Sequence, residues 1–142
     1  MRIFILVCGL FLSFNVAAKC DQAEADKGMS LSMQQCASDM FEKSDAKLNK
    51  IYKGIIQDLK KQATESSEKE YAEAMIVDLK ASQRDWVKFR DSECNRATGA
   101  HLPNAGRETQ ILYSLCPAKM TEERIKVLQA KCNEGDVLCV GY

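Results

Sequence analysis

The sequence predicts an all-α domain: an antiparallel hairpin of two long helices, stapled by disulfides, with two shorter helices packed on it. Apolar residues recur at steps of three or four over two long stretches, which is the period of one helix face. No stretch alternates apolar and polar residues for long enough to predict a strand. Cysteines are frequent, and they follow an N-terminal segment with the pattern of an export signal.

Residues 1–18 have the three parts of a secretory signal. Arg2 is followed by a short apolar run, and the run ends in the small pair Ala17 and Ala18. A membrane span would need about 20 apolar residues, and this run is shorter. We therefore expect cleavage after Ala18, no membrane insertion afterwards, and a single domain over residues 19–142 in the periplasm or secreted beyond it.

The charge balance argues against a nucleic-acid partner. The chain has 20 basic and 20 acidic residues, so removal of Arg2 with the signal leaves 19 against 20. A protein that binds nucleic acid is expected to carry a basic excess, and none remains here.

The cysteines predict a disulfide framework. One of the seven, Cys8, lies inside the predicted signal. An even number then remains, as is usual in exported domains: Cys20, Cys36, Cys94, Cys116, Cys132 and Cys139. Zinc sites usually bring ligands together over gaps of two to four residues, whereas the closest cysteines here are seven positions apart and the chain has one histidine. We expect disulfides, and neither a metal nor another cofactor.

The first long helix is predicted over about residues 32–62. Residues 19–31 show no period and are expected to form an extended arm held at Cys20. Ser32 and Gln35 have the spacing of a capping box. Apolar residues then follow at helical spacing: Met33, Cys36, Met40, Leu48, Ile51, Ile55 and Leu59.

The second long helix is predicted to end at Gly99, a residue that commonly terminates helices. It follows a polar turn over residues 62–67 and carries its own stripe: Tyr71, Met75, Leu79, Ser82, Trp86 and Phe89. Two long helices joined by a short turn pack as an antiparallel hairpin.

Two shorter helices are expected after the hairpin. Residues 99–106 form a loop, and residues 107–115 form a helix that Pro117 stops. Thr121 is then expected to cap a further helix.

The hairpin register favours one disulfide pairing. With the turn centred near residue 65, residues that face each other have numbers adding to about 130, which places Cys36 opposite Cys94. The alternative joins sequence neighbours, Cys20 with Cys36 and Cys94 with Cys116. We favour the bridge across the hairpin, and we expect Cys132 to pair with Cys139 in either scheme.

Polar residues also recur on the facing sides of the two helices: Asp45, Asn49 and Tyr52 on the first, and Gln83, Trp86, Arg90 and Asp91 on the second. They form either a functional site between the helices or a hydrogen-bond network that fixes the hairpin register. We interpret them as the structural network, because polar ladders between helices are usually structural.

The loop after the hairpin is the candidate contact with a target. The segment from Gly99 to Glu108 contains His101, Asn104 and Arg107, and cysteines flank it on both sides. A loop held in this way loses little entropy on binding, which favours inhibitors and recognition modules. We expect no enzymatic activity, because His101 is the single histidine, the cysteines are assigned to disulfides, and no glycine-rich phosphate loop is present.

These motifs resemble a known family. The chain contains Asp45-x-x-Leu48-Asn49-x-x-Tyr52, then Gln83-Arg84-x-Trp86-x-x-x-Arg90-Asp91-x-x-Cys94, and then Met120-Thr121-x-x-Arg124. In this order they resemble the LprI-type lysozyme-inhibitor family of exported bacterial proteins, over about residues 20–128. Two features depart from the family pattern: the additional Cys132 and Cys139, and the absence of a Gly-Gly-Ser run before Cys116.

The resemblance implies a protein partner, namely a lysozyme or another cell-wall hydrolase, which the protein would inhibit by covering the enzyme's cleft. The family supplies no inhibitory residue to transfer to this chain. The alternative is an interaction or immunity-type module that binds a different protein of the cell envelope.

Overall fold

The structure, a computed structural model, describes residues 20–28, 30–65, 67 and 69–130. These residues form four helices and no strand: α1 (Gln22–Asp26), α2 (Ser30–Glu65), α3 (Lys69–Thr98) and α4 (Arg107–Gln129). The predicted all-α class is confirmed. The predicted signal segment and the Cys132–Cys139 pair lie outside the described residues.

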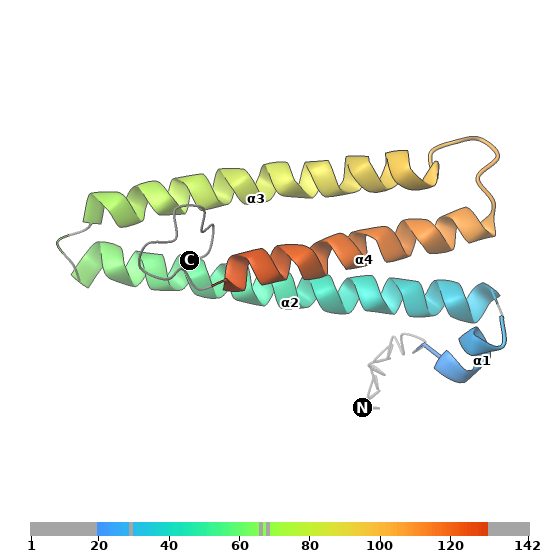
Figure 1. The fold of residues 1–142 in the computed structure, drawn as a ribbon. Coiled ribbons are helices and arrows are strands. Elements are labelled where there is room, and N and C mark those ends of the chain that lie inside the picture. The colour runs from blue at the N-terminus through green and yellow to red at the C-terminus, as the bar shows by residue number, and fades with distance from the viewer. Residues whose placement is uncertain (1–19, 29, 66, 68, 131–142) are drawn as a thin grey trace, which may run out of the picture.

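Helices α2 and α3 form the predicted antiparallel hairpin, and α4 is added to it as a third long helix (Figure 1). Helix α4 runs parallel to α2 and lies between α2 and α3, with more extensive contacts to α2. Helix α1 and the loop between α3 and α4 both lie at the end of the molecule opposite the α2–α3 turn.

The predicted extended arm before the first long helix is wrong. The segment forms α1, and Asp21 caps it because the Asp21 Oδ1 atom accepts the Glu24 backbone N–H at 3.1 Å. The predicted capping box of Ser32 and Gln35 is also wrong, because α2 begins two residues earlier at Ser30. The Gln35 amide instead donates to Asp39 one turn later.

The predicted break at Pro117 is wrong as well, since α4 is continuous through this residue. A proline inside a helix removes one backbone hydrogen bond and costs about 3 kcal/mol. Tertiary packing offsets this cost, because Pro117, Ala118 and Thr121 are all buried against the hairpin. Cys116 is in addition disulfide-bonded to α3.

The favoured Cys36–Cys94 bridge is wrong, and the alternative pairing is present. Cys20 is bonded to Cys36 and Cys94 to Cys116. The turn lies nearer residue 67 than residue 65, so that Asp45 faces Arg90. In this register the α2 position that faces Cys94 lies about five residues after Cys36. That offset is roughly 7.5 Å along the helix at 1.5 Å per residue. Helix α4 also separates the two helices at this end (Figure 1).

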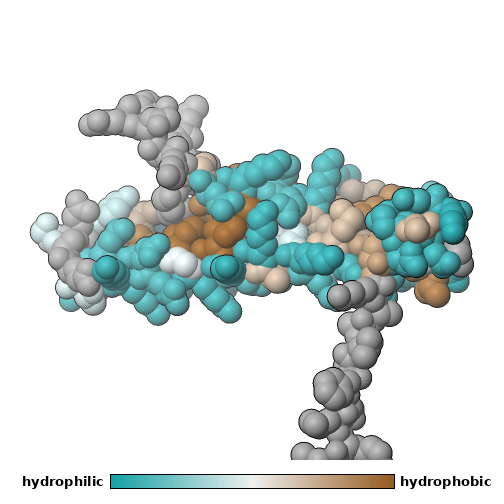
Figure 2. Space-filling view, turned by 90° about the horizontal axis from the view of Figure 1, so that it is seen from below, coloured by the Kyte–Doolittle hydropathy of each residue, from teal (hydrophilic) through white to brown (hydrophobic). Residues whose placement is uncertain are grey.

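The core is shared by three helices. Its buried members are Leu48, Ile56, Leu59, Leu79, Ile125 and Leu128. Four apolar residues that the sequence placed on buried stripes are instead exposed: Met33 at 39 %, Met40 at 55 %, Phe89 at 58 % and Tyr71 at 63 %. Other members of the predicted stripes are buried, among them Leu48, Leu59 and Leu79, so the predicted apolar faces coincide only in part with the faces that pack. Seen from the α2 side, hydrophilic side chains surround one strong apolar patch (Figure 2).

Candidate functional site

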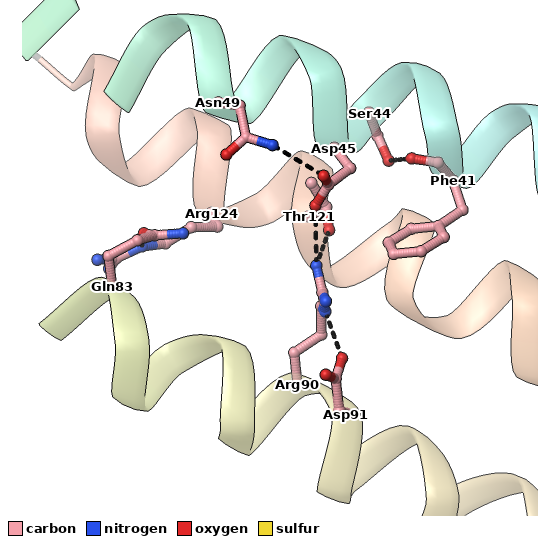
Figure 3. A network of polar contacts seen from close by, with 9 residues as sticks. All are labelled: Phe41, Ser44, Asp45, Asn49, Gln83, Arg90, Asp91, Thr121 and Arg124. Atoms are coloured by element: carbon pink, nitrogen blue, oxygen red, sulfur yellow. Dashed lines mark hydrogen bonds and ion pairs between the residues drawn. The ribbon is translucent and has the colours of Figure 1, made fainter. Parts of the chain in front are cut away.

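Arg90 lies at the centre of a polar network that joins the three long helices (Figure 3). Its side chain is 7 % exposed. The Nη1 atom donates to Asp45 Oδ1 on α2 at 3.3 Å and to Thr121 Oγ1 on α4 at 3.4 Å. The Nε atom donates to Asp91 Oδ1 at 2.8 Å. The guanidinium therefore has partners on every long helix.

Two aromatic rings flank the same guanidinium. The Arg90 Cζ atom lies 5.0 Å from the centre of the Phe41 ring and 5.2 Å from that of Trp86. At these distances a cation is attracted to the ring quadrupole. Arg124 of α4 adds a second cation 5.8 Å from Trp86, and its Nε atom donates to Gln83 at 3.2 Å.

The structure brings together six of the seven residues predicted for the network. Asn49 donates to Asp45 Oδ2 at 2.8 Å, and Tyr52 lies one turn further along α2, packed against the apolar core. No buried side-chain nitrogen or oxygen in the described part of the chain lacks a hydrogen-bond partner. A saturated network around a buried cation has the character of a packing element, and its structural role stays our interpretation.

Sequence reasoning missed Phe41 and Thr121 as members of this network. Phe41 reaches Arg90 from α2, and the Thr121 hydroxyl reaches it from α4. The helical spacing of Phe41 and Asp45, four residues apart, was an available signal. Thr121 belongs to the motif Met120-Thr121-x-x-Arg124, but its contact with Arg90 depends on where α4 packs.

The candidate contact loop is exposed over its three predicted residues. His101 and Asn104 lie in the connection between α3 and α4, whereas Arg107 is the first residue of α4. The three side chains are not hydrogen-bonded to one another. The His101 Nδ1 atom lies 3.3 Å from the backbone oxygen of Asn95, and Arg107 Nη1 donates to Ser30 Oγ of α2 at 2.8 Å.

The backbone of this loop is held by local bonds and one disulfide. Gly99 ends α3 with φ +66°, a conformation that favours glycine. The Leu102 N–H donates to the Gly99 oxygen, and the Ala105 N–H to the Leu102 oxygen, both at 3.0 Å. The Cys94–Cys116 disulfide ties the helices on either side. The exposed side chains thus stand on a fixed backbone.

Two apolar side chains near this loop were not predicted as contacts. Leu102 is 55 % exposed within the loop, and Leu31 is 72 % exposed next to the Ser30 that holds Arg107. Single exposed leucines are ordinary on protein surfaces, so these two alone do not mark a contact site. The end of the molecule that carries α1 presents polar and apolar side chains together.

Two acidic side chains near the loop end have shifted pKa values. The pKa of Asp39 is lowered, first because its carboxylate accepts the Cys20 backbone N–H at 2.7 Å and second because it accepts the Gln35 amide. The pKa of Glu93 is lowered by its hydrogen bonds from Arg96. Both carboxylates are therefore held ionised by partners within the fold.

A groove between α2 and α4 is a further surface feature that sequence reasoning missed. It has a volume of about 620 Å³, and Met40, Leu115 and Ala118 line it. The sequence predicts Met40 to be part of the core stripe, because its spacing fits the helix period. A signal that α2 and α4 run side by side was absent from the sequence.

The described residues hold no group of three or more histidine, cysteine or acidic side chains placed to bind a metal. Among the same residues, every helix is too short or too polar to cross a membrane.

Comparison with known proteins places most of the chain in one family. The family model described as lysozyme inhibitor LprI matches residues 20–128. The chain is also similar to an uncharacterized protein of Rhizobium meliloti (strain 1021), with 29 % identity over 136 residues that cover 91 % of this chain and 94 % of the relative. No solved structure matches the chain significantly.

Proposed function

The chain belongs to the LprI lysozyme inhibitor family, and from this premise we propose that it inhibits a peptidoglycan-cleaving muramidase by covering the enzyme's substrate cleft. His101 and Asn104 of the α3–α4 loop make the contact together with Arg107 at the start of α4. The family is one of inhibitors and not of enzymes. The observation that carries the proposal is the exposure of these three polar side chains on a backbone fixed by hydrogen bonds and a disulfide.

A fixed loop supports tight inhibition because little conformational entropy remains to be lost when the enzyme binds. The Gly99 terminus, the two turn hydrogen bonds and the Cys94–Cys116 disulfide restrict the loop before any partner arrives. The Arg107 side chain is further oriented by its hydrogen bond to Ser30.

The chemistry of the loop suits a glycosidase cleft. Glycosidases generally use a pair of carboxylates that flank the scissile bond. Arg107 offers five donors and a permanent positive charge, and Asn104 and His101 add hydrogen-bonding groups. The charged and polar loop thus complements the carboxylates that the substrate would otherwise cover.

The proposed place of action is outside the cytoplasm, in the periplasm or beyond. The predicted signal over residues 1–18 supports export. Two disulfides support an oxidising compartment.

The test is a titration of the purified, oxidised protein into muramidases of different structural classes, with hydrolysis of peptidoglycan as the readout. We expect stoichiometric inhibition of at least one class, and competition with a soluble glycan oligomer that occupies the cleft. Inhibition that the oligomer does not relieve would contradict the covering mechanism. Absence of inhibition in every class would favour the alternative, a module that binds another envelope protein.

A further inference from the structure

The groove between α2 and α4 has an apolar floor that is open to solvent. Met40 of α2 lines it from one side, and Leu115 and Ala118 of α4 line it from the other. Ala118 is 3 % exposed, whereas Met40 is 55 % exposed. Leu112, three residues before Leu115 on α4, is 49 % exposed. Methionine at such a position adapts its shape readily to an incoming side chain.

Lysines border this floor on both helices. Lys43 and Lys47 lie on α2, and Lys119 lies on α4. Lys47 is neutralised by Glu122, whose Oε2 atom is 3.2 Å from Lys47 Nζ. Lys43 and Lys119 have no ion pair within the described part of the chain, and both are exposed.

The acidic groups around the groove are already engaged. Glu123 lies at its edge and is paired with Lys126 at 2.7 Å. Asp39, one turn before Lys43, accepts hydrogen bonds from Cys20 and Gln35, and it is also attracted by the Lys43 ammonium. Lysines Lys43, Lys47 and Lys119 outnumber the glutamates Glu122 and Glu123 in the lining of the groove, which leaves one positive charge in excess beside the apolar floor.

We propose that this groove is a second contact region, which receives a projecting segment of the partner protein that bears an apolar side chain flanked by carboxylates. The apolar side chain fills the space over Met40, Leu115 and Ala118. The carboxylates pair with Lys43 and Lys119. The stems of these lysines cover further apolar surface on the segment while their ammonium groups stay in water.

The groove can act together with the loop on one partner. The contacts of Arg107 with Ser30 and of Lys47 with Glu122 show that α2 and α4 keep one register between the two regions. Met40 lies ten residues beyond Ser30, which is about 15 Å along a helix. A partner that covers the loop can therefore reach the groove. The groove proposal rests on the proposed function in one respect only, which is the identity of the partner as a muramidase.

The first experiment tests the groove without any enzyme. The probe is an acetylated and amidated peptide with one phenylalanine between glutamates. It is titrated into the full chain, and its binding is observed by NMR of the methionine and leucine methyl groups. We expect shifts at Met40 and Leu115, and binding of the glutamine analogue weaker by about fivefold, as two exposed ion pairs imply. Equal binding of both peptides, or no shift at these methyls, would overturn the proposal.

Charge reversal supplies the matched variants. Lys43→Glu with Lys119→Glu is expected to weaken binding of the acidic peptide by about tenfold, because attraction becomes repulsion. Lys53→Glu with Lys80→Glu makes the same change in net charge on exposed positions away from the groove. Loss of binding in both double variants would mean that net charge, and not the groove, governs the interaction, and would overturn the proposal.

The enzyme measurement separates this proposal from the proposed function. In a muramidase that the unmodified protein inhibits, the Lys43→Glu/Lys119→Glu variant is expected to need about tenfold more protein for half inhibition. Unchanged inhibition in this variant would overturn the groove proposal and leave the inhibitor function intact. If no muramidase is inhibited, the proposed function fails, and the peptide measurement still decides the groove.

Discussion

Arg90 brings charge, hydrogen bonding and ring stacking together at one position. Its guanidinium contacts Asp45 and Thr121 and lies close to the rings of Phe41 and Trp86. Its acidic partners are partly exposed, at 39 % for Asp45 and 49 % for Asp91, so water can solvate them when the arginine is removed. The cost of removing Arg90 is therefore smaller than for a wholly buried ion pair.

We expect Arg90→Ala to lower the free energy of unfolding by about 2–3 kcal/mol. The loss has two sources: a cavity beside the two rings, and a Thr121 hydroxyl left without its donor. Urea denaturation of the oxidised protein measures the change. Arg84→Ala on the exposed side of α3 is the control, with an expected change within about 0.5 kcal/mol. Equal losses in the two variants would contradict the role assigned to Arg90.

Asp39 links the stability of the α1 end to pH. Its pKa is lowered in the folded protein, chiefly by the Cys20 N–H. A carboxyl group of this kind stabilises the fold above its unfolded pKa, which is about 4, and the contribution is lost as the pH falls through the folded value. The unmodified protein should therefore have a higher free energy of unfolding than Asp39→Ala above about pH 5, and this difference should vanish in strong acid.

Urea midpoints at neutral and acid pH measure this difference. Asp58→Ala is the control, because Asp58 is exposed and makes no hydrogen bond through its side chain in the described part of the chain. A difference in urea midpoint between the unmodified protein and Asp39→Ala that stays constant down to pH 2 would contradict the attribution of the pH dependence to Asp39.

Some residue contacts could be predicted from the sequence and others could not. The facing of Asp45 and Arg90 follows from two helical patterns and a short turn, which are local signals. Phe41 and Thr121 join the same guanidinium through packing of a third helix. Met40 has the spacing of a core residue and is exposed for the same reason. Periodicity indicates that a helix has an apolar face, and it does not indicate which neighbours cover that face.

At the scale of elements, the two long helices follow from the sequence because their apolar periods are long and Gly99 marks an end. The unbroken helix α4 could not be predicted from the sequence. Pro117 disfavours it locally, whereas burial of its residues and the disulfide of Cys116 stabilise it. The preferred cysteine pairing failed for a related reason: a shift of the turn by about two residues moves facing positions by about a full helical turn.

Peptide mapping under non-reducing conditions is expected to yield Cys20 linked to Cys36 and Cys94 linked to Cys116. The two bridges should stabilise the fold by about 3 kcal/mol each by the chain-entropy estimate, since they close loops of 16 and 22 residues. Replacing Cys94 and Cys116 together by alanine should lower the free energy of unfolding by this amount. A Cys36–Cys94 peptide in the digest would contradict the structure.

The same double replacement should also weaken inhibition, because it frees the two helices on either side of the loop. Removal of the Cys20–Cys36 bridge by the matching pair of alanines is the comparison, since that bridge holds α1 and not the loop. We expect the larger loss of inhibition in the Cys94/Cys116 variant. An equal loss in both would indicate that global stability, and not loop order, determines inhibition.

At the scale of the whole molecule, three long helices form an elongated body with the candidate contact loop at one end (Figure 1). In this arrangement the Arg90 network, the loop end and the α2–α4 groove are separate parts of the molecule. The Arg90 network holds the helices together, the loop end presents polar groups, and the α2–α4 groove presents an apolar floor between lysines. Family motifs in the sequence fall mainly on the first of these parts, so the sequence predicts the fold better than the contact surface.

Inhibition of a muramidase by a loop variant is the most direct measurement of the proposed function. The variant replaces His101, Asn104 and Arg107 by alanine. Its control replaces Gln57, Lys60 and Lys80, three exposed polar residues of α2 and α3 outside the loop. With the helical content of both verified by circular dichroism, we expect the loop variant to need at least about tenfold more protein for half inhibition, while the control matches the unmodified protein. Equal inhibition by the loop variant and the unmodified protein would contradict the assignment of the loop as the inhibitory contact.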